Sequence, residues 1–208
     1  MGSGLVEILI RNGYLKSEFI IRAFNEIVRA DFVPSEFEEQ ADADIPLPIG
    51  FGQTISQPTT VAIMLELLNP KPNHKILDVG SGSGWTSALL GNIAGNEGKV
   101  VALEILPELY EMTKRNVEKF DLISSGIVEC VLGDGNQGHK QLSPYDRILV
   151  SAAADKVPQA LQDQLAVGGK MVIPIHNHLT YLEKRREGDF YKEEFPGFVF
   201  VPFVQKSF

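Results

Sequence analysis

Short apolar runs alternate with helix-like segments through residues 75–174 of the chain. The runs at 75–79, 99–103, 127–132, 147–150 and 170–174 have the length and residue types of buried strands. Residues 85–90 and 158–165 have helical composition, and residues 107–120 space their apolar side chains as a helix does. Such alternation is typical of parallel sheets with helical crossovers. The pattern predicts an α/β fold with a doubly wound, mostly parallel sheet and helices on both faces.

The N-terminal part has the pattern of a helical extension. Residues 5–11 predict a short helix closed by Asn12-Gly13, and Ser17 is a suitable N-cap for a second helix that should reach about Arg29. The acidic run 36–44 is interpreted first as a solvated face and second as a substrate-related surface. Another helix is predicted at 59–68. We expect one domain, in which residues 1–70 add helices and a substrate or cofactor loop to the core at 71–208.

The C-terminal part predicts an antiparallel edge to the sheet. Residues 179–184 and 198–204 are expected to be strands, with a turn at 187–189 after the first of them. Gly168-Gly169 is expected to end the helix at 158–165. The basic run 184–186 is interpreted as solvated charge.

Glycines at alternate positions follow the first of the buried runs. Asp78 precedes Gly80, Gly82 and Gly84, and Ser81 lies among them. Glycine lets the backbone turn tightly and lets a ligand lie against it, while the following helix directs unpaired N–H groups toward that ligand. A dinucleotide fingerprint requires a third glycine where Trp85 stands, which argues against NAD.

Two acidic positions after the glycines complete a nucleotide-like pattern. Glu104 ends the run at 99–103, at a distance suited to binding both hydroxyls of a ribose. Asp134 and Gly135 follow the run at 127–132, at the edge where ligands bind in open α/β sheets, so they could contact a ligand. The alternatives are a solvated loop acid for Glu104 and a simple turn for Asp134-Gly135.

The polar, glycine-rich segment at 49–58 has two interpretations from its chemistry alone. Its backbone and hydroxyl donors could wrap a ligand, or Thr54, Ser56 or Thr59 could cap the following helix. The residues by themselves do not favour either one.

A resemblance to a known family bears on this segment. Residues 46–58, with the sequence PLPIGFGQTISQP, closely resemble the signature of protein-L-isoaspartate O-methyltransferases. The similarity extends over most of the chain and includes residues 32–34, 77–84, 133–135, 145–154, 157–161 and 200–203. It implies a Rossmann-like methyltransferase fold.

The resemblance also implies a reaction and a set of site residues. The methyl group of S-adenosyl-L-methionine would pass to the α-carboxyl of an L-isoaspartyl residue in a damaged protein or peptide, leaving S-adenosyl-L-homocysteine. A carboxylate acceptor is already ionised at neutral pH, so no strong base is needed. Ser56 is the implied active-site residue, and the implied cofactor-binding residues are Gln53, Thr54, Ile55, Ser56, Asp78, Gly80, Ser81, Gly82, Glu104, Asp134 and Gly135.

The chain departs from the family pattern on the substrate side. Thr59-Thr60 stands where an aromatic residue or histidine is common, and Asp155 stands where a proline is common. Two alternatives therefore remain. The protein could methylate another carboxylate or a small molecule, or it could bind S-adenosylmethionine or isoaspartyl peptides without turnover.

Composition restricts the partners and the compartment. The 208 residues are 44% apolar and carry a net charge of −8, which argues against broad nucleic-acid binding. Without a membrane-spanning stretch or a leader pattern, we expect no membrane partner and a cytoplasmic monomer. The single cysteine, Cys130, is expected to be a core residue. His176 and His178 complete no metal-ligand spacing, so we expect no metal.

Overall fold

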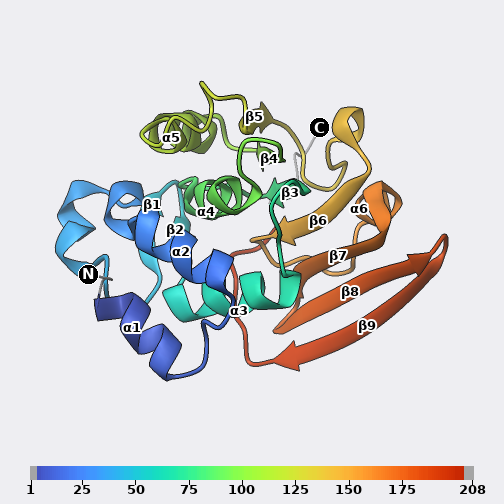
Figure 1. Ribbon diagram of the computed structural model, residues 1–208, viewed down its shortest axis with the longest axis horizontal. Helices are drawn as coiled ribbons and strands as arrows, with labels where there is room; N and C mark the ends of the chain where they lie inside the picture. The colour runs from blue at the N-terminus through green and yellow to red at the C-terminus, as the bar shows by residue number, and fades with distance from the viewer. Residues whose placement is uncertain (1–3, 204–208) are drawn as a thin grey trace.

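The computed structural model describes residues 4–203 and is built around one large, mostly parallel sheet (Figure 1). Its strand order is β5-β4-β3-β6-β7-β8-β9. The strands from β5 to β7 run parallel to their neighbours, whereas β8 and β9 pair antiparallel. The bounds of these strands are β3 Lys75–Val79, β4 Lys99–Glu104, β5 Val128–Leu132, β6 Tyr145–Val150, β7 Leu165–Ile175, β8 His178–Arg186 and β9 Asp189–Pro196. The predicted fold class and its antiparallel edge are confirmed.

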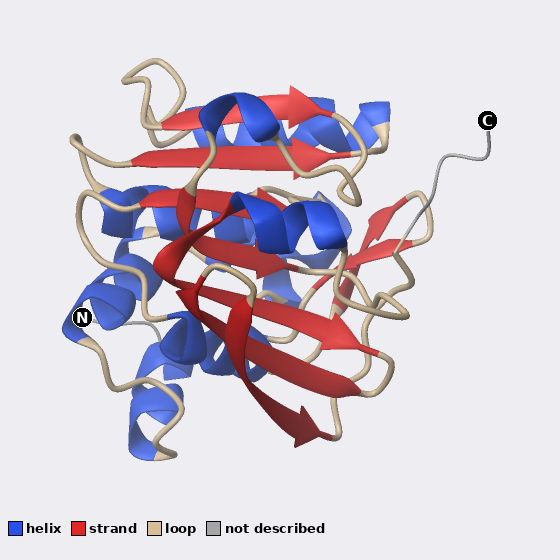
Figure 2. Ribbon diagram, turned by 90° about the vertical axis from the view of Figure 1, so that its right-hand side faces the viewer, coloured by secondary structure: helices blue, strands red, loops and turns tan. Residues whose placement is uncertain are grey.

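Helices lie on both sides of this sheet (Figure 2). Side chains from α1 to α5 pack in one core cluster, and α6 packs in the other through Leu161. Neighbouring strand residues alternate between the clusters, so that Ile76 faces α1 to α5 while Leu77 faces α6. The helices are α1 Gly4–Arg11, α2 Glu18–Glu26, α3 Pro58–Leu68, α4 Trp85–Ala94, α5 Pro107–Glu118 and α6 Gln159–Gln164. Within residues 4–203, no helix has the length and apolar character needed to cross a membrane.

Helix α2 ends earlier than predicted and is anchored in an unexpected way. It stops at Glu26, and a separate 3-10 helix, η1, covers Arg29–Phe32. Ser17 occupies the N-cap position but makes no capping bond, because its hydroxyl donates to Glu66 of α3 at 2.7 Å. The same carboxylate accepts the amides of Lys16 and Ser17. Glu66 therefore ties α2 to α3.

Two predictions for the C-terminal part were wrong. Gly168-Gly169 does not end a helix, since β7 begins at Leu165 directly after α6 and contains both glycines. The last strand of the sheet is β9 rather than residues 198–204. Its side chains are mostly exposed at the sheet edge, so it lacks the apolar alternation by which strands are recognised. Residues 198–203 form only one isolated bridge, between Pro202 and Ala153, and residue 204 lies outside the described part of the chain.

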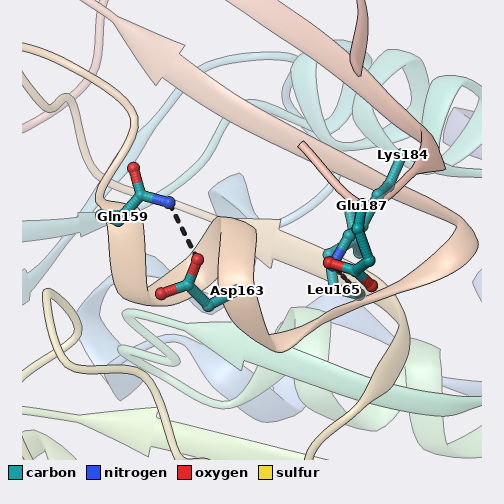
Figure 3. A network of polar contacts seen from close by, with 5 residues as sticks. All are labelled: Gln159, Asp163, Leu165, Lys184 and Glu187. Atoms are coloured by element: carbon teal, nitrogen blue, oxygen red, sulfur yellow. Dashed lines mark hydrogen bonds and ion pairs between the residues drawn. The ribbon is translucent and has the colours of Figure 1, made fainter. Parts of the chain in front are cut away.

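Lys184 is not part of a solvated charged run, contrary to the prediction. It is 3% exposed, and its Nζ donates to the carbonyl of Leu165 at 3.0 Å and pairs with Glu187 at 2.9 Å (Figure 3). Figure 3 also shows Gln159 donating to Asp163 within α6, at 2.8 Å. Lys184 thereby links β8 to the start of β7.

Candidate active site

The glycine loop lies between β3 and α4, at the carboxyl edge of the parallel strands. The amides of Gly80 and Ser81 donate to the carbonyl of Leu103, at the end of β4. Gly80 has φ 78°, and a Cβ added there would meet no atom within 4 Å. A glycine is therefore required at this position by the backbone conformation, and the space beside it is open to a ligand.

Side chains of helix α5 form hydrogen bonds with the glycine loop. The Thr113 hydroxyl donates to the carbonyl of Gly82 at 2.9 Å and lies 3.0 Å from the Ser81 hydroxyl. Asn116 donates to the carbonyl of Ser83 at 2.9 Å. At Gly84 an added Cβ would lie 3.2 Å from the Thr113 Cα, so only glycine permits this close approach. The loop is thus fixed by contacts with α5 as well as by its own turn.

Glu104 ends β4 and faces the glycine loop. Its Oε1 accepts the amides of Ile105 and Leu106 at 2.8 and 3.0 Å, and its Oε2 accepts the amide of Gly82 at 2.9 Å. The residue is 5% exposed. Three backbone donors hold the carboxylate in one orientation and leave acceptor capacity on Oε2 for a ligand hydroxyl.

Asp78 lies beneath the loop and is fully buried. Its Oδ2 accepts the hydroxyls of Thr86 and Ser87 at 2.8 and 2.6 Å, while its Oδ1 has no partner among the described residues. Burial raises the pKa of this carboxyl to about 6, against the effect of the two hydroxyls. Asp78 does not line the cavity that lies over the loop. Its carboxylate holds β3 against α4 through Thr86 and Ser87, and its predicted contact with the cofactor stays a prediction.

A cavity of about 800 Å³, including the part open to solvent, lies over the loop and is called the main cavity. Of the predicted site residues, Gln53, Thr54, Ile55, Ser56, Gly80, Ser81, Gly82, Glu104 and Gly135 line it. Apolar residues that carry no ligand-binding signature in the sequence also line it, among them Leu106, Leu109, Trp85 and Phe203. Nine of the predicted site residues therefore line the same cavity.

Asp134 and Gly135 behave differently from one another. Asp134 is not part of the cavity lining, and its Oδ1 accepts the amide and the side-chain nitrogen of Asn136. Gly135 lines the cavity, but a glycine is required there because neighbouring side chains leave no room for a Cβ. A Cβ there would lie 2.5 Å from Val79 Cγ1 and 2.7 Å from Phe203 Cζ. The missing side chain therefore makes room for Phe203.

The segment 49–58, predicted as a substrate or cofactor loop, overlaps a β-hairpin. Strands β1, Leu47–Gly50, and β2, Gln53–Ile55, pair antiparallel. The hairpin directs Ile49 and residues 53–56 toward the main cavity. Ser56 follows β2 and precedes α3, which begins at Pro58.

Ser56 also lines a second, adjoining cavity of about 730 Å³ measured in the same way, called the side cavity. Thr54, Ser151 and Val201 likewise line both cavities. The remaining lining residues are Pro46, Gln57, Thr60, Val199 and Phe200. Ser56 therefore stands where two separate molecules could meet.

The N-terminal end of α3, close after Ser56, is capped by a residue that lies far from it in the sequence. Neither Thr54 nor Ser56 caps the helix, and the N-cap residue Gln57 makes no capping bond. Instead Asp44 accepts the amide and the hydroxyl of Thr59 at 2.8 and 2.7 Å. These bonds hold the pKa of the Asp44 carboxyl below its usual value, although partial burial opposes them. Thr59 is thus a partner of Asp44, whereas Thr60 lines the side cavity.

Metal ligands do not gather in the described part of the chain. Residues 4–203 contain no group of three or more His, Cys, Asp or Glu side chains placed to hold an ion. His176 lies in the turn before β8 with φ 52°, whereas His178 is the first residue of β8, so the two histidines do not belong to one strand.

Comparisons with known proteins agree on one family. The family model described as protein-L-isoaspartate(D-aspartate) O-methyltransferase matches residues 2–208. Among curated proteins, the protein-L-isoaspartate O-methyltransferase of Methanopyrus kandleri is 42% identical and that of Aeropyrum pernix is 46% identical. Each alignment covers 96% of this chain, with 89% and 78% of the respective relatives.

Solved structures show the same similarity in three dimensions. A protein-L-isoaspartate O-methyltransferase superposes with a TM-score of 0.89 at 29% identity, covering 99% of this chain and 66% of the other. A second structure, from Plasmodium falciparum, is assigned to the same activity and contains S-adenosyl-L-homocysteine. It superposes with a TM-score of 0.85 at 26% identity, and the alignment covers 97% of both chains.

Proposed function

The chain belongs to the protein-L-isoaspartate(D-aspartate) O-methyltransferase family, and we propose that its two cavities hold the two reactants of that reaction. It is an S-adenosylmethionine-dependent enzyme that methylates the α-carboxyl of L-isoaspartyl residues in damaged proteins and peptides. In our proposal the main cavity receives the cofactor and the side cavity receives the isoaspartyl group.

The residues of the main cavity fit S-adenosylmethionine. Glu104 would accept hydrogen bonds from the ribose hydroxyls, and the open backbone at Gly80 would lie against the methionine part. Gly133 and Gly135 line the end where the adenine would lie. Gln53, Thr54 and Ile55 would close the cavity from the hairpin side.

Asp134 remains a predicted contact of the adenine. Its Oδ1 is used by Asn136, and its Oδ2 accepts no hydrogen bond from the residues that the structure describes. That oxygen is the one available to the amino group of the adenine.

The observation that carries the proposal is the position of Ser56 on both cavities. The cofactor supplies an electrophilic methyl group on its sulfonium. Because an acceptor carboxylate needs no base, the residues have to orient it and exclude water. The Ser56 hydroxyl would donate a hydrogen bond to one carboxylate oxygen. This bond would leave the other oxygen facing the main cavity.

Methyl transfer from labelled S-adenosylmethionine tests this function. Two peptides are used that are identical except that one carries L-isoaspartate and the other L-aspartate at a single position. We expect transfer to the isoaspartyl peptide only. Equal transfer to both, or transfer to neither while the cofactor binds tightly, would contradict the proposed acceptor.

We further propose that the protein acts as a monomer in the cytoplasm, without nucleic-acid or membrane partners. Its net charge of −8 disfavours binding to phosphate backbones. Its only cysteine, Cys130, is partly buried and free, as suits a reducing compartment. Light scattering from the eluted peak of a sizing column tests the oligomeric state, since a dimer would have twice the mass of 22.9 kDa.

A further inference from the structure

Arg29 lies behind Ser56 and is almost completely buried. It is 4% exposed and belongs to η1, far from Ser56 in sequence. Its guanidinium makes four hydrogen bonds, all to backbone carbonyls. Nη1 donates to Ala41 and Ala43 at 2.9 and 3.2 Å, and Nη2 donates to Ile45 and Ser56 at 2.9 and 3.1 Å. One cation thus joins the 41–45 segment to the carbonyl of the proposed active-site residue.

The environment of Arg29 keeps it in one orientation. Its guanidinium carbon lies 5.5 Å from the centre of the Trp85 ring, and Trp85 itself lines the main cavity. Burial lowers the pKa of Arg29 to about 10, with Asp44 and Asp42 opposing the shift. The group therefore remains charged at neutral pH, and its charge is compensated by four carbonyl oxygens together with Asp44 and Asp42. A planar guanidinium with fixed donors suits this geometry better than an ammonium group does.

Asp44 holds the residues on the other side of Ser56. It lies within the 41–45 segment that Arg29 binds, and it accepts Thr59 and the side chain of Gln57 at 2.7 to 3.1 Å. Arg29 fixes the Ser56 carbonyl, and Asp44 fixes the next turn of chain. Together they leave the Ser56 peptide little freedom.

We propose that Arg29 is a positioning residue for methyl transfer, which sets the Ser56 hydroxyl at the junction of the two cavities. This inference rests on the proposed function of Ser56. Arg29 lines neither cavity, so it acts through the backbone and not on the substrate. A reacting group misplaced by about 1 Å can cost on the order of 100-fold in rate. The hydrogen bonds from Arg29 to the 41–45 segment and to Ser56, here called the Arg29 clamp, should therefore influence turnover more than cofactor binding.

The test compares Arg29→Lys with Arg22→Lys. Arg22 also lies beside an aromatic ring, that of Phe19, but it is exposed and belongs to α2. We expect Arg29→Lys to lower kcat toward the isoaspartyl peptide by about 10- to 100-fold. Its affinity for S-adenosyl-L-homocysteine, measured by calorimetry, should change less than about threefold. Arg22→Lys should change neither quantity.

A double-mutant cycle separates positioning from general loss of structure. If Arg29 acts through Ser56, Arg29→Lys should cause little further loss of kcat in the Ser56→Ala background. Equal losses in both backgrounds, or a matching loss of cofactor affinity, would overturn the inference. Asp44→Asn provides a second variant, which should show the same pattern more weakly.

Hydrogen exchange supplies a readout that does not depend on the acceptor. Arg29→Lys should speed amide exchange in a fragment covering residues 53–60 while leaving the fragment that contains α5 unchanged. Unchanged exchange at 53–60 would overturn the inference. If the unaltered protein failed to methylate the isoaspartyl peptide, the proposed function would fail, and exchange would still decide whether Arg29 holds Ser56.

Discussion

The amide of Gly82 donates a 2.9 Å hydrogen bond to Oε2 of Glu104, the oxygen proposed to bind the ribose. The other oxygen of the same carboxylate accepts two amides at the end of β4. The glycine loop and the ribose-binding acid therefore form one hydrogen-bonded unit. A change to either should affect both binding and local stability.

Removing the Glu104 carboxylate should weaken cofactor binding. Glu104→Ala leaves three backbone amides without their acceptor and removes the ribose contact. A hydrogen bond to a charged group contributes about 1.5–3 kcal/mol, so we expect affinity for S-adenosyl-L-homocysteine to fall by about 10- to 100-fold. Calorimetry measures this loss, with Glu108→Ala as the exposed control on α5. Unchanged affinity in Glu104→Ala would exclude the ribose assignment.

Ser56→Ala should separate turnover from cofactor binding. The change removes a single hydroxyl at the junction of the cavities, while the backbone at Ser56 keeps its bond to Arg29. We expect kcat with the isoaspartyl peptide to fall by about 10- to 100-fold, since correct orientation of the acceptor is lost. Binding of S-adenosyl-L-homocysteine should be nearly unchanged. Parallel losses of both would mean that Ser56 acts only as part of the cofactor site.

Thr113 offers a test of the support that α5 gives the glycine loop. Thr113→Val preserves the shape of the side chain but removes the hydroxyl that contacts Ser81 and Gly82. An unpaired buried polar group costs about 1–3 kcal/mol, so thermal stability and cofactor affinity should both decrease. Thr113→Ser retains the hydroxyl and should recover most of the affinity. Normal stability and cofactor affinity in Thr113→Val would show that the hydroxyl does not support the loop.

Asp78 should make the protein less stable as pH rises. Its pKa is about 6 in the folded protein against 3.8 as the ordinary value, so the native state binds its proton more tightly. The unfolding free energy should fall as pH rises through the window from about 4 to 6, by about 3 kcal/mol in total from this group. Asp78→Asn cannot ionise and should lack this component.

Denaturant unfolding at several pH values measures the effect of Asp78. The unfolding free energy of the unaltered protein minus that of Asp78→Asn should decrease between about pH 4 and 7. A difference that stays constant across this range would show that Asp78 ionises in the folded protein as it does in the unfolded chain.

The parts of the site that follow strand ends could be predicted from the sequence. Gly80 and Glu104 each come directly after a buried apolar run, and parallel strands bring their carboxyl ends to one edge. Local pattern and topology together therefore place these residues in the same cavity. The segment 46–58 was assigned by family resemblance, although its hairpin was not foreseen.

Other parts depend on contacts that leave no local pattern. Arg29 binds carbonyl oxygens, which every residue possesses, so nothing near it in the sequence marks its partners. Asp44 caps a helix that begins well after it, whereas capping rules consider only adjacent residues. Asp78 was assigned to the cofactor because its position fits the motif. Only packing reveals that Thr86 and Ser87 of the following helix turn back onto it.

Trp85 is the only tryptophan in the chain, and it lies between the wall of the main cavity and the guanidinium of Arg29. Its indole nitrogen faces the carbonyl of Ile27 at 3.4 Å, and its ring meets Phe24 edge to face. The tryptophan fluorescence of the protein therefore comes from a single residue at the site itself. Ligand occupancy and the integrity of the Arg29 clamp can both be followed in solution without attaching a dye.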